Sequence, residues 1–122
     1  MEKYEQWAQF IDDGKSKHKS EIEVLEKDER SDEAKFLKAG LNIYDVFNSL
    51  FETSRKQSKE NEALMISMFE NLSKKVPENW VKSLELAKAH DDTEKILIEE
   101  AKLNVAKACI DKFREIYVAG DK

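Results

Sequence analysis

The sequence contains few residues that interrupt regular structure: one proline, Pro77, and three glycines, Gly14, Gly40 and Gly120, among 122 residues. Proline and glycine are the strongest local breaks in a chain, whereas Ala, Leu, Glu and Lys favour helices. Long stretches that are rich in Ala, Leu, Glu and Lys and contain no proline or glycine indicate helices joined by short connections. The scarcity of breakers therefore predicts an all-α protein.

Cysteine and long apolar runs are also scarce. Cys109 is the single cysteine, so the chain forms no internal disulfide and has no zinc site built from several cysteines. No apolar run exceeds four residues, whereas a membrane-spanning helix needs about 20. The first residues, Met1 to Glu5, hold no apolar core of a signal peptide. We therefore expect a cytoplasmic protein without a membrane partner.

The net charge of −5, with acidic and basic residues intermingled, disfavours nucleic acid as a partner. A local basic segment at residues 15–19 holds Lys15, Lys17, His18 and Lys19, but acidic residues follow it and no aromatic residue lies within it. We interpret this segment as a solvated helix end, because cations are common near helix C-termini. The alternative is single-stranded RNA binding, with an affinity that falls steeply as salt rises.

The N-terminal segment predicts a long helix. Tyr4, Trp7 and Ile11 recur at helical spacing, and similar spacing continues to about Asp28. This pattern favours one helix that includes Gly14, at a cost of about 1 kcal/mol for a glycine inside a helix. The alternative ends the helix at Gly14, because three lysines follow it as they often follow a C-terminal cap.

The second predicted helix begins at Ser31, a residue type that caps helix N-termini. Its apolar stripe runs from Phe36 to Phe51 and is the densest in the chain. Gly40 lies on this stripe, where the missing side chain lets a neighbouring backbone approach closely. We therefore place Gly40 inside the helix and not at its end.

Three further helices are predicted. Ser58 is the expected cap of the third, whose stripe covers residues 64–76. Pro77 restricts the residue before it towards an extended conformation and begins a short fourth helix with its apolar face in residues 80–87. The last helix runs from about Thr93 to Val118, with an apolar stripe too wide for a two-stranded coiled coil.

The resulting fold prediction is all-α: an antiparallel up-and-down helical bundle of four main helices plus one short helix after Pro77, in a single domain of residues 1–122. The predicted core is drawn from every helix: Trp7, Ile11, Leu37, Tyr44, Phe47, Phe51, Met68, Leu72, Trp80, Leu84, Leu103, Ile110 and Phe113.

One polar cluster offers chemistry. His90, Asp91 and Asp92 precede Glu99 and Glu100, and Mg²⁺ and Mn²⁺ take carboxylate oxygens as ligands. The alternative function is therefore a Mg²⁺- or Mn²⁺-dependent phosphoryl or pyrophosphate hydrolase. We favour a simpler interpretation, in which the aspartates cap a helix and the glutamates lie on a solvated face beside lysines.

No pattern typical of catalysis or of cofactor binding stands out. Cys109 lies between Ala108 and Ile110 on an apolar face, as buried unreactive cysteines do. The serines lack the glycine-flanked turn of a nucleophile elbow. We therefore predict a non-enzymatic protein that presents a helical face to another protein or to a second copy of itself. Neutralising a toxin, as immunity proteins do, is one version of this function and depends on fold analogy alone.

Four segments are distinctive: residues 41–47, Asn79–Trp80, residues 88–95 and residues 99–102. They resemble segments of small uncharacterised all-helical proteins of Gram-positive bacteria, and the resemblance covers most of residues 30–117. It implies a bacterial, cytosolic, all-helical protein. It implies no activity, ligand or partner.

Overall fold

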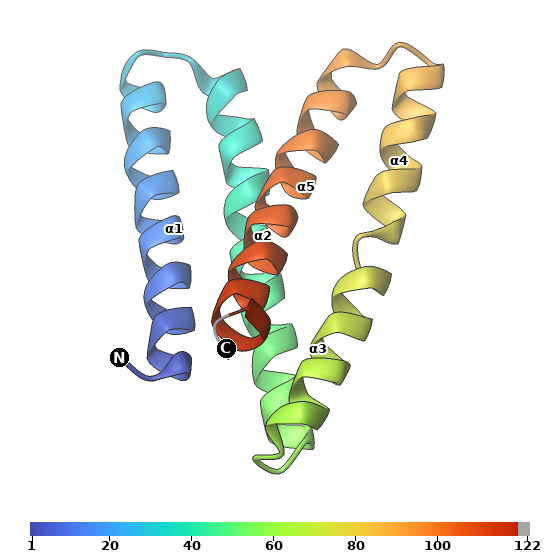
Figure 1. Ribbon diagram of the computed structural model, residues 1–122. Helices are drawn as coiled ribbons and strands as arrows, with labels where there is room; N and C mark the ends of the chain where they lie inside the picture. Colours follow the sequence, from blue (N-terminus) through green and yellow to red (C-terminus); the bar gives the residue numbers. More distant parts are fainter. Residues whose placement is uncertain (120–122) are drawn as a thin grey trace.

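The computed structural model describes residues 1–119, and these residues form helices and no strand (Figure 1). Five α-helices are followed by one π-helix: α1 Lys3–Lys27, α2 Ser31–Gln57, α3 Glu62–Lys75, α4 Glu78–Ala89, α5 Thr93–Arg114 and η1 Glu115–Ala119. The all-α prediction is confirmed. The last three residues of the predicted domain, Gly120 to Lys122, lie outside the described residues.

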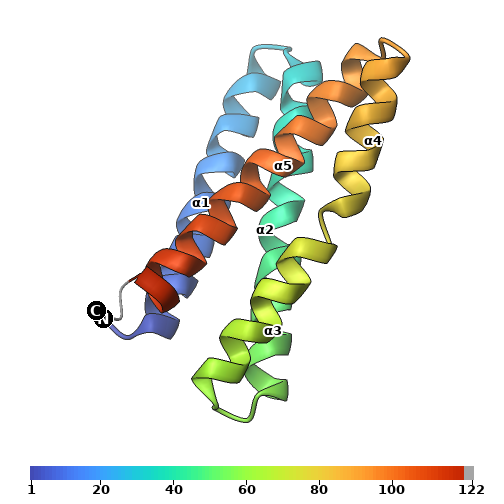
Figure 2. The same cartoon turned by 45° about the vertical axis from the view of Figure 1, so that its right-hand side comes forward.

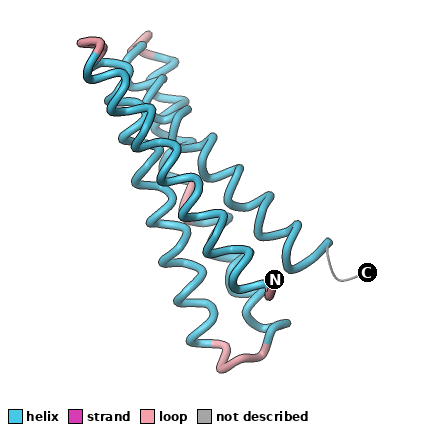
Figure 3. The backbone as a smooth tube through the Cα atoms, turned by 90° about the vertical axis from the view of Figure 1, so that its left-hand side faces the viewer, coloured by secondary structure: helices cyan, strands magenta, loops and turns pink. Residues whose placement is uncertain are grey.

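Neighbouring helices run in opposite directions, except that α3 and α4 run in the same direction (Figure 1). Helices α1 and α2 form a hairpin, α3 and α4 follow one another along a single arm, and α5 returns beside α2 and α4. Figure 2 and Figure 3 show the α1–α2 and α4–α5 connections at one end of the molecule, which we call the tip. The N-terminus, the α2–α3 connection and η1 lie at the opposite end, which we call the base.

The helix boundaries agree with the sequence except at local details. Helix α1 passes through Gly14 and α2 through Gly40 without a break, as predicted. Ser31 begins α2, but neither it nor Arg30, which occupies the cap position, makes a side-chain cap hydrogen bond. The predicted cap at Ser31 is therefore wrong.

The predicted cap of the third helix is also wrong. Ser58 instead ends α2, and the Oδ1 atom of Asn61 accepts the backbone N–H of Leu64 at 3.1 Å. Because α3 begins only after Asn61, it has 14 residues and is nearly as short as α4, which has 12. Val76 keeps a helical conformation (φ −60°, ψ −44°) before Pro77 instead of the extended one predicted, because the chain only kinks between α3 and α4 and does not reverse.

Aromatic side chains from four helices form the centre of the core. The rings of Phe69 and Phe113 stack with centroids 3.9 Å apart, and those of Trp7 and Phe51 stack at 5.0 Å. Trp7 meets Phe69 edge to face at 5.7 Å. Such pairs each contribute about 0.5–1.5 kcal/mol beyond the burial of their area. These contacts tie α1, α2, α3 and α5 together near the base.

About half of the predicted core is confirmed as buried: Trp7, Ile11, Tyr44, Phe47, Phe51 and Phe113. The other predicted core residues are only half-buried: Leu37, Met68, Leu72, Trp80, Leu84, Leu103 and Ile110. Trp80 and Ile110 pack against the edge of the core. For the residues of α3 and α5 the difference is a rotation of the helix. Helix α3 buries Met65 and Phe69, and α5 buries Ala106 and Cys109.

The core is unevenly distributed along the bundle. Its main cluster includes positions 7–11 of α1, 43–51 of α2 and 105–113 of α5, all in the half of each helix nearer the base. Near the tip the buried residues are Ile22 and smaller or polar residues such as Ala34, Ala87 and Glu99. Apolar side chains at the tip therefore have less core to pack into, and several remain on the surface.

Candidate functional site

The acidic cluster predicted from the sequence lies at the tip, in the α4–α5 connection and the first turns of α5. His90 ends α4 and is exposed, and Asp91 is exposed with a left-handed φ of 54°. Asp92 caps α5, because its Oδ1 atom accepts the backbone N–H of Lys95 at 3.2 Å. The predicted cap is confirmed for Asp92, and the same prediction for Asp91 is wrong.

The two glutamates of that cluster have different surroundings. Glu99 is only 4% exposed, and its Oε1 atom accepts from Nζ of Lys102 at 3.2 Å. Its Oε2 atom is buried without a hydrogen-bond partner. Glu100, the next residue, is exposed, so the predicted solvated position is confirmed for Glu100 and wrong for Glu99. Within residues 1–119, no three His, Cys, Asp or Glu side chains are placed to share a metal ion. The geometry thus gives no support to the hydrolase alternative.

The basic segment at residues 15–19 is divided between packing and surface. Lys15 forms an ion pair with Asp45 of α2 at 2.6 Å. The His18 ring meets Tyr44 edge to face at 5.3 Å, and its Nδ1 atom lies 3.2 Å from the Gly14 carbonyl oxygen. Lys17 and Lys19 are exposed. These side chains therefore do not form one continuous basic surface for a nucleic acid.

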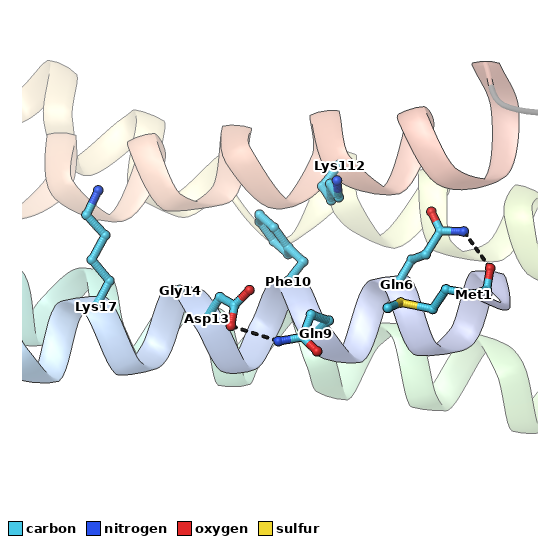
Figure 4. Close-up of a pocket in the computed structure, with 8 residues that line it drawn as sticks. All are labelled: Met1, Gln6, Gln9, Phe10, Asp13, Gly14, Lys17 and Lys112. Atoms are coloured by element: carbon cyan, nitrogen blue, oxygen red, sulfur yellow. Dashed lines mark hydrogen bonds between the residues drawn. The ribbon is translucent and has the colours of Figure 1, made fainter.

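Lys17 also lines an open pocket of about 410 Å³ between α1 and α5. Figure 4 shows Phe10 near the middle of this pocket and Lys112 of α5 facing α1. The polar groups of α1 bond one another: Gln6 donates to the carbonyl of Met1, and Gln9 donates to Asp13, both at 2.9 Å. We assign no ligand to this pocket, because nothing in its lining indicates the chemistry of one.

Cys109 is fully buried, and this burial raises the pKa of its thiol to about 12. The group therefore stays protonated at neutral pH, whereas the thiolate is the form that acts as a nucleophile. The sequence-based interpretation of Cys109 as a buried, unreactive thiol agrees with this environment.

An apolar groove opens at the tip between α1 and α2. We call it the α1–α2 groove; it has a volume of about 310 Å³ and is lined by Ser20, Glu21, Val24, Leu25 and Leu37. Val24 is 58% exposed although it is a large apolar residue. The sequence placed Leu37 in the core, because its spacing fits the apolar stripe of α2. The structure instead makes it one wall of a surface groove.

A second groove lies on the other side of α2, against α5. It has a volume of about 290 Å³, and Phe36 and Leu97 are its apolar lining residues. An ion pair between Lys35 and Glu94 joins the two helices beside it. The two grooves thus flank the first turns of α2, and the one between α1 and α2 is the more apolar of the two.

No family model, curated protein or solved structure matches the chain. The resemblance to Gram-positive proteins therefore stays an expectation from the sequence. Within residues 1–119, none of the helices combines the length and the apolar character needed to cross a bilayer.

Proposed function

We propose that the protein acts without catalysis, by binding another protein through the α1–α2 groove at its tip. The observation that carries this proposal is the exposure of Val24 beside the half-buried Leu25 and Leu37. Full burial of an aliphatic side chain of this size contributes about 1.5–3 kcal/mol. A partner that covers the groove gains the part of this free energy that corresponds to the exposed 58% of Val24.

The charges around the groove indicate the chemistry of the partner. Residues 20–38, which form the tip of the α1–α2 hairpin, include seven acidic and four basic residues, a net charge of −3. Complementary charges steer association and suppress wrong partners. A groove between two helices accommodates the apolar face of an amphipathic helix. The partner we propose is therefore an amphipathic helix with lysine or arginine on its polar face.

We place this binding in the cytoplasm. The single cysteine, Cys109, suits a reducing compartment. A homo-oligomer is the competing version of an interaction function. It is disfavoured because two copies of the tip would bring like charges together, which costs free energy.

The experiment uses a synthetic peptide of about 14 residues, an ideal helix of about 21 Å, with leucine on one face and lysine on the other. A peptide with glutamate in place of lysine is its control. Calorimetry is expected to show that the leucine–lysine peptide binds the protein and that the leucine–glutamate peptide does not.

Two protein variants separate docking in the groove from general attraction between opposite charges. Val24→Asp and Leu86→Asp each add one negative charge at an exposed apolar position; Val24 is 58% and Leu86 62% exposed. Docking in the groove predicts that Val24→Asp lowers the affinity for the leucine–lysine peptide at least tenfold and that Leu86→Asp changes this affinity little. The proposal is overturned if both variants bind the peptide as tightly as the unchanged protein does, or more tightly. It is also overturned if the protein is a dimer that Val24→Asp dissociates.

A further inference from the structure

A second candidate binding site lies at the base, where four elements meet. This cleft, which we call the base cleft, has a volume of about 400 Å³ and is formed by the start of α1, the end of α2, the start of α3 and η1. Met65 and Tyr117 line it although each is only 5% exposed, and Tyr4, at 40% exposure, also lines it. The volume of the cleft is within the range of about 300–1,000 Å³ that is common for small-molecule sites.

Cationic groups lie over the aromatic part of this lining. The guanidinium carbon of Arg55 lies 4.1 Å from the centroid of the Tyr4 ring, and Nζ of Lys3 lies 5.6 Å from that of Tyr117. A guanidinium that stacks on a ring by its face keeps its N–H edge directed away, and that edge matches the two oxygens of a carboxylate. The ion pair of Arg55 with Glu52 is long, at 3.5 Å. Arg55 is therefore held in place and can still bind an anion.

Acidic groups line the same cleft, so its charge is mixed. Glu60 and Glu62 come from the α2–α3 connection and the start of α3, and Glu62 pairs with Lys3 at 2.7 Å. Glu2 adds a third carboxylate. A simple anion would meet these three carboxylates, and a simple cation would meet Arg55 and Lys3. The arrangement favours a molecule that carries both charges next to an apolar body.

The backbone around the cleft is irregular on two sides. Lys59 and Glu60 are consecutive non-glycine residues with left-handed φ values of 51° and 69°. On the opposite side η1 is a π-helix, and its winding buries both Ile116 and Tyr117. Left-handed residues other than glycine and π-helical turns both cost stability and are frequent at ligand sites. Each irregular segment contributes one residue to the lining of the cleft, Glu60 and Tyr117.

We propose that the base cleft binds a free α-amino acid with a large apolar side chain. Its carboxylate pairs with Arg55, its ammonium group lies against Glu60 and Glu62, and its side chain covers Met65 and Tyr117. This site is at the opposite end of the molecule from the α1–α2 groove. The inference therefore does not depend on the proposed protein-binding function.

The test uses three ligands that share one apolar body. L-Phenylalanine carries both charges, phenethylamine lacks the carboxylate and 3-phenylpropanoate lacks the ammonium group. Backbone amide shifts of residues 59–65 and 115–117, measured by NMR at ligand concentrations up to about 10 mM, give each affinity. L-Phenylalanine is expected to bind at least tenfold more tightly than either analogue. No shift with L-phenylalanine, or equal affinity for one of the analogues, overturns the proposal.

Two arginine variants locate the site. Arg55→Gln removes the guanidinium from the base cleft, and Arg114→Gln removes a guanidinium from another part of the surface. The two side chains have similar environments. That of Arg55 is 48% exposed and pairs with Glu52, and that of Arg114 is 54% exposed and pairs with Glu70 at 3.4 Å. Arg55→Gln is expected to weaken L-phenylalanine binding at least tenfold, and Arg114→Gln is expected to leave it unchanged. Equal effects of the two variants would place the bound amino acid outside the cleft.

Discussion

Gly14 of α1 leaves room for the ring of Tyr44 of α2, since a Cβ atom on Gly14 would lie 2.4 Å from the Tyr44 Cζ atom. The ring is fixed from two further sides, by an edge contact with His18 at 5.3 Å and another with Phe10 at 6.0 Å. Gly14, which the sequence also allowed as a helix end, is therefore the point where α1 and α2 pack most closely around the Tyr44 ring.

Replacing Gly14 by alanine is expected to destabilise the protein by about 1–3 kcal/mol, the usual cost of overpacking. Helix propensity alone predicts the opposite, a gain of about 1 kcal/mol. Urea unfolding measures the difference, with Ser16→Ala as the control, because Ser16 is an exposed residue of the same helix. A more stable Gly14→Ala protein would show that Tyr44 does not occupy this space.

Glu99→Met is expected to raise the free energy of unfolding by about 1 kcal/mol. The Glu99 Oε2 atom is buried without a partner, and such a group costs about 1–3 kcal/mol. Lys102, which would lose its ion pair, has a side chain 26% exposed and can be solvated. Glu100→Met, at the exposed neighbouring position, is the control and should change stability by less than about 0.5 kcal/mol. A clear loss of stability in Glu99→Met alone would mean that Glu99 has a stabilising partner.

The orientation of α3 is tested by two neighbouring residues. Phe69 is 1% exposed and stacks on Phe113, whereas Met68 is half-buried. Phe69→Ala should cost about 3–5 kcal/mol, as large-to-small changes in a core do. Met68→Ala should cost about 1 kcal/mol, since less of its area is buried. Thermal and urea unfolding give both values, and the reverse order would support the stripe centred on Met68 that the sequence suggested.

Stability is expected to fall in alkaline solution as pH rises from about 9 to 12. Burial raises the pKa of Cys109 and of Tyr117 to about 12, from ordinary values of 9.0 and 10.0. Between those values and 12 the unfolded chain loses protons that the folded protein keeps, so the free energy of unfolding decreases with pH. Tyr117→Phe removes one of these groups and should make the decrease shallower between pH 10 and 12. Urea unfolding at a series of pH values measures both slopes, and identical slopes would contradict this account.

The sequence predicted the helices well because their causes are local. Residue spacing and the scarcity of glycine and proline are sufficient to place α1 and α2 to within a few residues. The third cap was misplaced because Ser58 and Asn61 are both good caps, and the choice depends on where α2 ends. Lys59 and Glu60 terminate that helix in left-handed conformations that nothing in the sequence indicates.

The rotation of α3 and α5 was not predictable in the same way. Helix α5 packs against α2 on one side and α4 on the other, so several of its apolar lines compete for burial. The line through Glu99, Ala106 and Phe113 is buried although it includes a charged residue. Periodicity identifies which residues share a face, but the neighbouring helices decide which face is central.

The candidate sites were missed for a related reason. Leu37 has the same spacing as a core residue, and only the thin core at the tip leaves it in a groove with Val24. The base cleft joins residues far apart in the chain, such as Tyr4, Arg55 and Tyr117. The acidic cluster at residues 90–100 was visible in the sequence because its members are close together, but the helix distributes them between a cap, a buried pair and the surface.

The most direct test of the central claim is NMR mapping of the leucine–lysine peptide on the isotope-labelled protein. Docking in the α1–α2 groove predicts that the largest amide shifts occur at residues 20–25 and at Leu37, and that they disappear in Val24→Asp but persist in Leu86→Asp. Shifts spread over acidic residues of the whole surface, unchanged by Val24→Asp, would contradict the claim.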